Sequence, residues 1–142
     1  MARRARRTRE QKYPDTDTFH FYNANPKGKY TCDCVIRAVA TALDRPWEEV
    51  MMEMASMACS TGYAINSKQN MDSYLQARGF TRQKQPRKPD RTKYTGEEFC
   101  SIFDGMCVAN IGGNHVVCIK DGKVNDTWDS TGGCIGNYWT KG

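Results

Sequence analysis

The chain has 142 residues, of which 39% are hydrophobic and 11% aromatic, and it carries a formal net charge of +5 at pH 7. This length suffices for one domain with its own core, and the apolar content excludes a chain that is disordered throughout. No window approaches the roughly 20 consecutive apolar residues of a membrane span, so we expect no membrane partner.

Residues 1–14 form a basic arm in front of the domain, which we place at residues 15–142. Residues 1–12 alone carry a net charge of +5. Such an arm is expected to be extended, and disordered when isolated. No apolar run follows its arginines, as a secretory signal would require, and Glu10 argues against a mitochondrial presequence. We therefore expect a cytoplasmic protein.

A short strand and a buried helix are expected next. Alternation over residues 18–22 predicts the strand, and residues 23–29 have the composition of a loop. The apolar run from about Cys34 to Leu43 predicts a helix, with Asp33 as its N-cap.

Three more helices and a long loop follow. Pro46 begins the second helix at its favoured first position. Ser67 caps a third helix, which Gly79 ends. Residues 81–95 predict a long exposed loop and residues 95–103 a short fourth helix. The methionines of the second helix are interpreted as deformable core: Met51, Met52, Met54 and Met57.

The last third of the chain has the pattern of a β-sheet. Four segments predict strands: 107–111, 115–120, 123–128 and 135–139. Between the second and third of these, Asp121-Gly122 is a strong signal for a two-residue hairpin turn. Helices first and an antiparallel sheet second predict an α+β domain.

Cys34 stands where a loop ends and an apolar helix begins. The first turn of a helix carries unpaired N–H groups and the positive end of the helix dipole, so a thiolate there is stabilised and its pKa can fall below ~8.5. Buried cysteines are more often small hydrophobes. The hypothesis of a nucleophile therefore depends on a partner elsewhere in the chain.

The other cysteines do not indicate a metal site. The chain has seven, an odd number without framework spacing, which favours free thiols in a reducing compartment. Cys32 and Cys34 are separated by one residue, whereas zinc ligands are typically separated by about two to four. His20 and His115 are the two histidines, and we expect neither a metal nor a cofactor.

The predicted hairpin places a candidate base beside a candidate acid. Opposed residues share a face of the sheet, as do alternate residues along a strand. His115, Asp126 and Trp128 therefore project from one side, with Val117 opposite Asp126 and His115 opposite Trp128. Asp126 then lies diagonally beside His115, whereas Asp129 falls on the other face. Nearer the turn, the same register pairs Lys120 with Lys123, Ile119 with Val124 and Cys118 with Asn125.

These residues predict a Cys–His–Asp triad. His115 could take the thiol proton of Cys34 and later protonate a leaving amine, while Asp126 orients the imidazole. Trp128 would exclude water from the hydrogen bond between histidine and aspartate. The alternative interpretations are that His115 has its hydrogen bonds satisfied within the sheet and that Asp126 is a solvent-exposed acid of the hairpin.

The same motifs resemble those of the papain-like cysteine peptidases, closest to compact phage and bacterial members. Residues 32–40 are similar to the family's nucleophile helix, residues 114–117 to its histidine strand, and residues 126–128 to its Asn-Ser-Trp, with Asp in place of Asn. The resemblance implies an N-terminal helical part whose nucleophile helix packs on a C-terminal antiparallel sheet. It implies a cysteine peptidase or isopeptidase acting on a protein or peptide through an acyl-enzyme, with deamidase and transamidase variants close to it. It also suggests the cytoplasm of a phage's host cell.

The family usually places a Gln or Asn several residues before the cysteine, where its amide binds the developing oxyanion. This chain has Gly28 six residues before Cys34. The nearest amides are Asn25 and Asn23, and either could serve; the backbone N–H of Cys34 would be the other donor. The charge of Asp33 opposes thiolate formation at its neighbour.

A second hypothesis is a non-enzymatic basic protein that binds nucleic acid or an acidic partner. Residues 82–93 carry a further net charge of +5. Together with the arm they could contact phosphates or carboxylates. The candidate contacts are Arg3, Arg4, Arg6, Arg7, Arg87 and Lys88. Both hypotheses hold if the arm delivers an enzyme to a polyanionic assembly.

Overall fold

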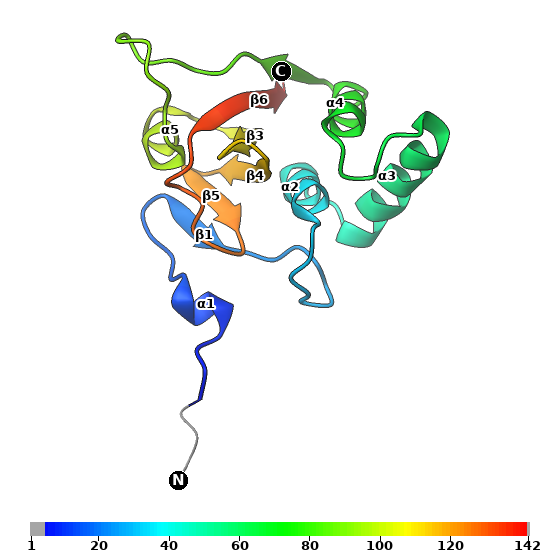
Figure 1. Cartoon of the computed structure of the whole chain (residues 1–142), viewed down its shortest axis with the longest axis horizontal. Coiled ribbons are helices and arrows are strands. Elements are labelled where there is room, and N and C mark those ends of the chain that lie inside the picture. The colour runs from blue at the N-terminus through cyan, green and yellow to red at the C-terminus, as the bar shows by residue number, and fades with distance from the viewer. Residues whose placement is uncertain (1–4, 142) are drawn as a thin grey trace.

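The computed structural model describes residues 5–141, which form five helices and six strands (Figure 1). The helices are α1 (Arg9–Lys12), α2 (Cys34–Leu43), α3 (Trp47–Thr61), α4 (Lys68–Gln76) and α5 (Gly96–Ile102). The strands are β1 (Phe19–Phe21), β2 (Phe80–Gln83), β3 (Met106–Ile111), β4 (His115–Lys120), β5 (Lys123–Asp126) and β6 (Ile135–Lys141). Within residues 5–141, none of the helices combines the length and apolar character needed to cross a membrane.

All six strands join one sheet in the order β1-β5-β4-β3-β6-β2. The α+β class is therefore confirmed. The expectation of a purely antiparallel sheet is wrong, because β1 pairs with β5 in parallel, with Phe19 opposite Val124 and Phe21 opposite Asp126. The other neighbouring strands are antiparallel. The sheet thus recruits a strand from the N-terminal part of the chain.

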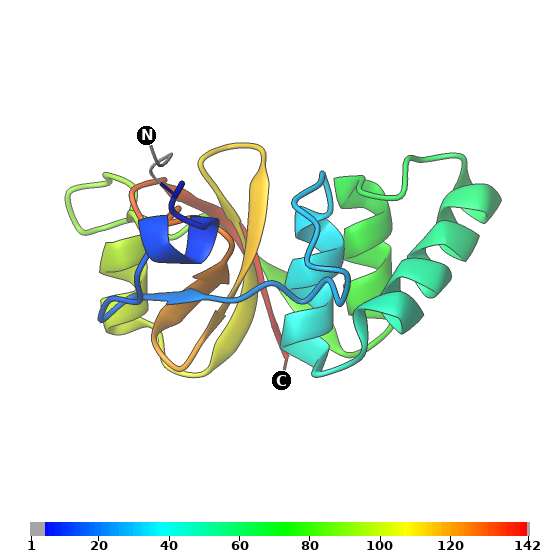
Figure 2. The ribbon, with the colours of Figure 1, turned by 90° about the horizontal axis from the view of Figure 1, so that it is seen from below.

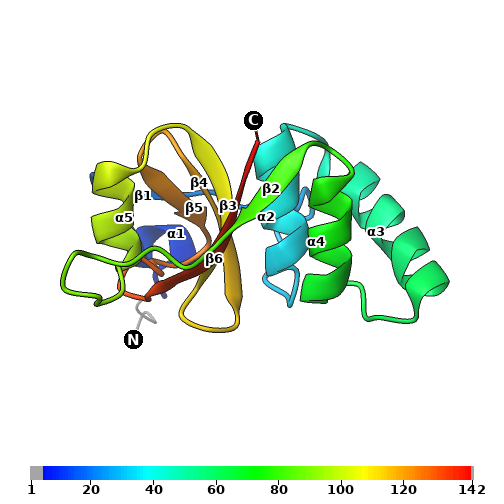
Figure 3. The same cartoon turned by 90° about the horizontal axis from the view of Figure 1, so that it is seen from above.

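Helices cover both faces of this sheet (Figures 2 and 3). On one face, α2, α3 and α4 enclose a core with Val108, Val116 and Trp139. On the other face α5 packs over a second core, which contains Val117 and Ile119. Because neighbouring residues of β4 belong to opposite cores, the strand is apolar almost throughout rather than alternating.

Helix α2 lies at the centre of the larger core and packs directly on β4. Its bounds, Cys34–Leu43, are as predicted, and Asp44 ends it in the left-handed conformation at φ 51°. Val35, Ile36 and Val39 are almost completely buried. Burial on this scale fixes the helix, and with it the position of Cys34 relative to the start of β4.

The predicted helices that follow are present as α3, α4 and α5, although α4 ends at Gln76 rather than at Gly79. Ser67 accepts a hydrogen bond at the start of α4, and Thr95 does so at the start of α5. Pro46 occupies the N-cap of α3 rather than its first turn. Of the four methionines interpreted as core, Met54 is fully buried, but Met52 is 72% exposed, so that interpretation is wrong for Met52.

Two segments expected to be irregular are regular. The first part of the loop predicted over residues 81–95 belongs to β2, an edge strand paired with β6. The basic arm, expected to be extended, contains α1, whose start is fixed by a capping box between Thr8 and Gln11. That box is a local signal readable from the sequence. The arm is therefore helical at Arg9–Lys12 rather than extended throughout.

Candidate active site

The structure brings Cys34 and His115 into one open pocket of about 470 Å³. Cys34 is the first residue of α2, and His115 is the first residue of β4. Both side chains are partly buried. Because α2 packs on β4, the two side chains meet where the helix and the strand begin.

His115 lies between Cys34 and Asp126. Its Nε2 is 2.6 Å from Asp126 Oδ2, which leaves Nδ1 as the ring nitrogen available to Cys34. Burial alone would lower the pKa of His115, but the hydrogen bonds with Asp126 and Cys34 and their charges raise this pKa to about 9. The imidazole is therefore protonated at neutral pH.

The pKa of Cys34 is shifted in the opposite direction. Burial would raise it, but hydrogen bonds from His115 and from the backbone N–H of Val116, together with the charges of His115 and Arg37, hold this pKa below its ordinary value. The start of α2 favours the thiolate further. Both shifts therefore favour the form of the pair in which Cys34 is a thiolate and His115 an imidazolium.

Asp126 is fully buried and accepts four hydrogen bonds. Its donors include His115 at 2.6 Å, the Oγ of Ser130 at 2.7 Å and the backbone N–H of Thr127 at 2.7 Å. Burial would raise the pKa of Asp126, but these bonds and the charge of His115 lower it. The carboxylate therefore stays ionised and fixed in orientation.

The predicted hairpin is confirmed, but only as far as Asn125. Asp121 and Gly122 both have positive φ, and the pairs from Lys120–Lys123 to Cys118–Asn125 are formed. Beyond Asn125 the strand leaves β4, and Asp126 lies opposite Phe21 instead. The expected pairs of Asp126 with Val117 and of Trp128 with His115 are not formed. The predicted contact between His115 and Asp126 is nevertheless present.

Arg37 is a further residue of the site, which the sequence reasoning missed. It is 9% exposed, and it binds two carboxylates: its Nε lies 2.8 Å from Asp33 Oδ1 and its Nη1 lies 3.1 Å from Asp126 Oδ1. Its signal in the sequence was a lone charge in an otherwise apolar helix, one turn after Cys34.

Asp33 occupies the N-cap position of α2, but its side chain makes no capping hydrogen bond. Its carboxylate instead accepts from Arg37 and, at 3.1 Å, from the indole Nε1 of Trp47. Arg37 therefore compensates the negative charge of Asp33, which by itself would disfavour the neighbouring Cys34 thiolate.

Trp128 lies beside the imidazole, outside β5. Its ring centre is 5.1 Å from that of His115, with the planes inclined at 38°. The side chain is 39% exposed, so it forms part of the pocket surface while covering one side of His115.

The amides of Asn23 and Asn25 are used inside the loop that precedes Cys34. Asn23 donates to the carbonyl of Lys29 at 3.1 Å. Asn25 is buried, accepts from the backbone N–H of Lys27 and directs its Nδ2 toward Asp33. Neither side chain lines the pocket, so the structure does not bring these amides to the thiol.

Two other amides line the pocket with Cys34, namely those of Asn66 and Asn114. Asn66 precedes the cap of α4, and Asn114 immediately precedes His115. The sequence did not predict either residue as part of the site. Their distance from Cys34 along the chain gives no indication of it, because both reach the pocket through the packing of α4 and of the β3–β4 turn.

The cleft continues on the other side of His115 and Trp128 into a cavity of about 540 Å³. Backbone from two glycine-containing turns lines this part, including Gly112, Gly132 and Gly133. Asn114, His115 and Trp128 line both this cavity and the Cys34 pocket.

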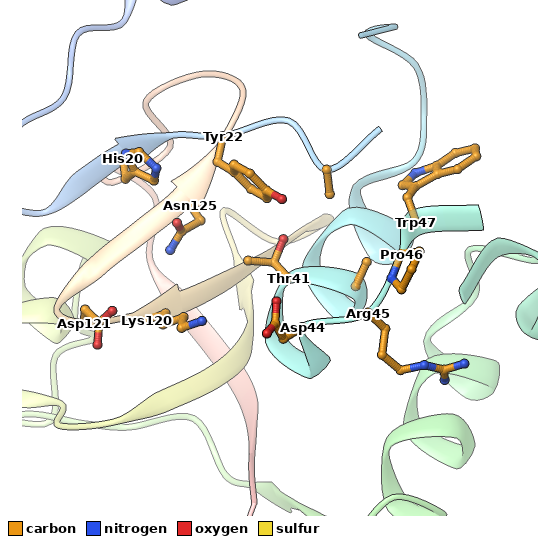
Figure 4. Close-up of a pocket in the computed structure, with 12 residues that line it drawn as sticks. His20, Tyr22, Thr41, Asp44, Arg45, Pro46, Trp47, Lys120, Asp121 and Asn125 are labelled. Atoms are coloured by element: carbon orange, nitrogen blue, oxygen red, sulfur yellow. The ribbon is translucent and has the colours of Figure 1, made fainter. Parts of the chain in front are cut away.

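A separate pocket of about 320 Å³ lies at the opposite end of α2 (Figure 4). Thr41 and Asp44 line it from the helix, and His20 and Asn125 line it from the sheet (Figure 4). None of its lining residues is a cysteine. It therefore has no nucleophile of the kind found at Cys34.

The predicted basic contacts do not form one surface in the described part of the chain. Arg6 and Arg7 are exposed, whereas Lys88 pairs with Glu98. Figure 1 shows α1 and the loop after β2 at opposite ends of the molecule. Arg87 donates to Gln85 and to the carbonyl of Arg91 within that loop. Arg3 and Arg4 lie outside the described residues.

Within residues 5–141, no three histidine, cysteine or carboxylate side chains are grouped as a metal site would need. In comparisons with known proteins, no family model, no curated protein and no solved structure matches the chain. Its function has to be inferred from its own geometry.

Proposed function

We propose that this chain is a papain-like thiol hydrolase that cleaves a peptide or isopeptide bond through an acyl-enzyme on Cys34. The observation that carries the proposal is the position of His115, which is bonded to the buried Asp126 at 2.6 Å and lines an open pocket together with Cys34. Perturbed pKa values of a nucleophile and its base, together in one pocket, are typical of catalytic sites.

The reaction starts from the thiolate–imidazolium pair. The sulfur of Cys34 attacks the carbonyl carbon, and His115 then gives its proton to the nitrogen of the leaving amine as the C–N bond breaks. The product is a thioester on Cys34 and a free amine. Water next attacks the thioester while His115 takes its proton, which releases a carboxylic acid and restores the pair.

The oxyanion formed in each attack needs hydrogen-bond donors. The backbone N–H of Cys34, at the start of α2, is one such donor. Because Asn23 and Asn25 are engaged elsewhere, we assign the second donor to one of the two pocket amides, Asn66 or Asn114.

Asp126 and Arg37 act behind the reacting groups. Asp126 holds the imidazole in one orientation and keeps it protonated, and Arg37 keeps Asp126 ionised. Three features support a papain-like architecture. They are this arrangement of Asp126 and Arg37 behind His115, the order Cys, His, Asp along the chain, and the packing of α2 on β4.

Deamidation and transamidation use the same steps with a side-chain amide as substrate or an amine as acceptor.

All seven cysteines are free thiols, which suits a reducing compartment, and we place the activity in the cytoplasm.

A fluorogenic peptide-amide library tests the proposal directly. We expect cleavage by the wild-type chain and none by Cys34→Ala, with a thioester-linked adduct on Cys34 detectable by mass spectrometry when a slowly hydrolysed substrate is used. Cys59→Ala serves as the matched control, because Cys59 is an exposed free thiol that lines neither part of the cleft. Cleavage that persists in Cys34→Ala contradicts the proposal.

The second candidate, a basic nucleic-acid-binding protein, stays a prediction. Its test is a fluorescence anisotropy titration with DNA and RNA at low and moderate salt. Binding through phosphates falls steeply with salt and weakens in Arg6→Gln and Arg7→Gln.

A further inference from the structure

Arg9 is held at the edge of the Cys34 pocket by contacts with both segments that carry the triad. Its Nη1 lies 3.4 Å from Thr127 Oγ1, in the residue after Asp126. Its guanidinium lies 4.1 Å from the ring centre of Tyr30, in the loop that leads to Cys34. The arm was expected to be extended and solvated, but α1 instead places one of its arginines in the lining of the pocket.

The charge of Arg9 has no carboxylate partner among residues 5–141. The other cations in the pocket both pair with carboxylates: Arg37 with Asp33 and Asp126, and the imidazolium of His115 with Asp126. No aspartate or glutamate lines this pocket. Arg9 is therefore the cation of the pocket that is available to a ligand.

A second cation extends this side of the cleft. Arg9 and Lys12 line a neighbouring pocket of about 320 Å³ with Tyr13 and Trp128, again without a carboxylate. Within residues 5–141, Lys12 also forms no salt bridge. The two side chains lie on α1, so they approach the triad together.

The opposite side of the cleft lacks such a charge. The cavity beyond Trp128 is lined by Ile111, by glycine-containing turns and by one acid, Asp129, whose Oδ1 accepts from the backbone and hydroxyl of Thr131. The cleft thus carries an arginine and a lysine on the side of α1, whereas neither residue type lines the cavity on the other side.

We propose that the substrate is a peptide with an aspartate or glutamate side chain next to the scissile amide, and that Arg9, assisted by Lys12, binds this carboxylate. The inference rests on the proposed function of Cys34. A guanidinium binds a carboxylate through two parallel hydrogen bonds, and the stacking on Tyr30 fixes its plane before the substrate arrives.

Paired alkylation of the full-length chain tests the inference without a known substrate. Iodoacetamide and iodoacetate react alike, since the sulfur of Cys34 forms a C–S bond and iodide leaves, but the second reagent carries a carboxylate. In low salt we expect Arg9→Gln to lower the ratio of the iodoacetate rate to the iodoacetamide rate by about two- to fivefold. The iodoacetamide rate itself should stay within about twofold, because the thiolate of Cys34 depends on His115 and Arg37.

Two further variants separate charge from structure. Arg9→Lys keeps the charge and should retain most of the ratio. Lys27→Gln removes an equal charge from the exposed loop before Cys34, outside the pocket, and should leave the ratio unchanged. An unchanged ratio in Arg9→Gln, or an equal fall in Lys27→Gln, overturns the inference.

The same measurement separates failure of the inference from failure of the proposed function. If Cys34 reacts no faster than the other cysteines with either reagent, the proposed function fails. If Cys34 is the most reactive thiol but its ratio does not depend on Arg9, only the inference fails. With cleavable peptides, Arg9→Gln should reduce the preference for Glu over Gln beside the cleaved bond by at least about tenfold in kcat/KM.

Discussion

Arg37 and Asp126 form a buried ion pair in which Nη1 lies 3.1 Å from Oδ1, while the other oxygen of the same carboxylate lies 2.6 Å from Nε2 of His115. The two oxygens of Asp126 thus have different tasks. One is held by a permanent positive charge, and the other orients the imidazole that serves Cys34. Helix α2 therefore supplies both the thiol of Cys34 and the counter-charge of Asp126.

Replacing Arg37 by methionine should destabilise the fold and weaken the thiolate together. The change leaves Asp33 and Asp126 without their cation, so we expect the free energy of unfolding to fall by about 3–5 kcal/mol. Urea denaturation measures this loss. Arg87→Met, in an exposed loop, should change it by less than about 0.5 kcal/mol. Equal losses in both variants contradict the assigned role.

Cys34 should be the most reactive thiol of the chain at about pH 6, where an ordinary cysteine is almost entirely protonated. Burial raises the pKa of Cys100 to about 11 and that of Cys118 to about 12, so these thiols should be inert. Limited iodoacetamide labelling with peptide mapping gives the rate at each of the seven cysteines. His115→Ala should abolish the advantage of Cys34, and equal labelling of the exposed thiols and Cys34 would refute its activation.

Asp126→Asn should impair turnover far more than Asp129→Asn. The first change removes the acceptor and charge that fix His115, which lowers kcat by about 10²–10⁴. The second removes a carboxylate that bonds to Thr131, outside the triad. Steady-state kinetics on one cleavable peptide compares them. A larger loss of kcat in Asp129→Asn than in Asp126→Asn would show that Asp126 is not the acid that orients His115.

The pH profile of kcat/KM should be bell-shaped, with its alkaline limb near the pKa of His115, about 9. Above this limb the imidazole has lost the proton that the leaving amine needs. The acid limb reports protonation of the Cys34 thiolate, whose pKa is lowered. Removing the charge of Asp126 in Asp126→Asn lowers the pKa of His115, so the alkaline limb should move to lower pH. If the alkaline limb does not move in Asp126→Asn, it does not report the ionisation of His115.

Alanine at one of the two pocket amides should reveal the oxyanion donor. Loss of such a donor typically lowers kcat by about 10²–10³ with little change in KM. We expect this from either Asn66→Ala or Asn114→Ala, and a much smaller change from Asn23→Ala, whose amide donates within its own loop. If Asn23→Ala has the largest effect, the loop must rearrange when substrate binds.

Features set by neighbouring residues were predictable from the sequence. The helix at Cys34 follows from its apolar run, and the hairpin follows from Asp121-Gly122, whose two positive φ angles suit a two-residue turn. The hairpin also led to the prediction of the contact between His115 and Asp126, although the pairing assumed for it ends at Asn125.

Features set by distant packing were not predictable. The parallel pairing of β1 with β5 joins residues about a hundred positions apart, and a three-residue strand does not specify its partner. The same holds for Asn66 and Asn114, which reach the pocket through separate turns. Arg9 shows this most clearly, because a basic arm is ordinarily solvated and only its contacts with Tyr30 and Thr127 reveal otherwise.

The pairing of Phe21 with Asp126, together with the hydrogen bond from the backbone N–H of Tyr22 to the Asp126 carbonyl, has a consequence for biosynthesis. The ribosome produces the thiol long before it produces the base and the acid. Until the later strands emerge and dock, Cys34 has the chemistry of an ordinary side chain. Topology therefore delays the activation of the Cys34 sulfur until the chain around it is folded.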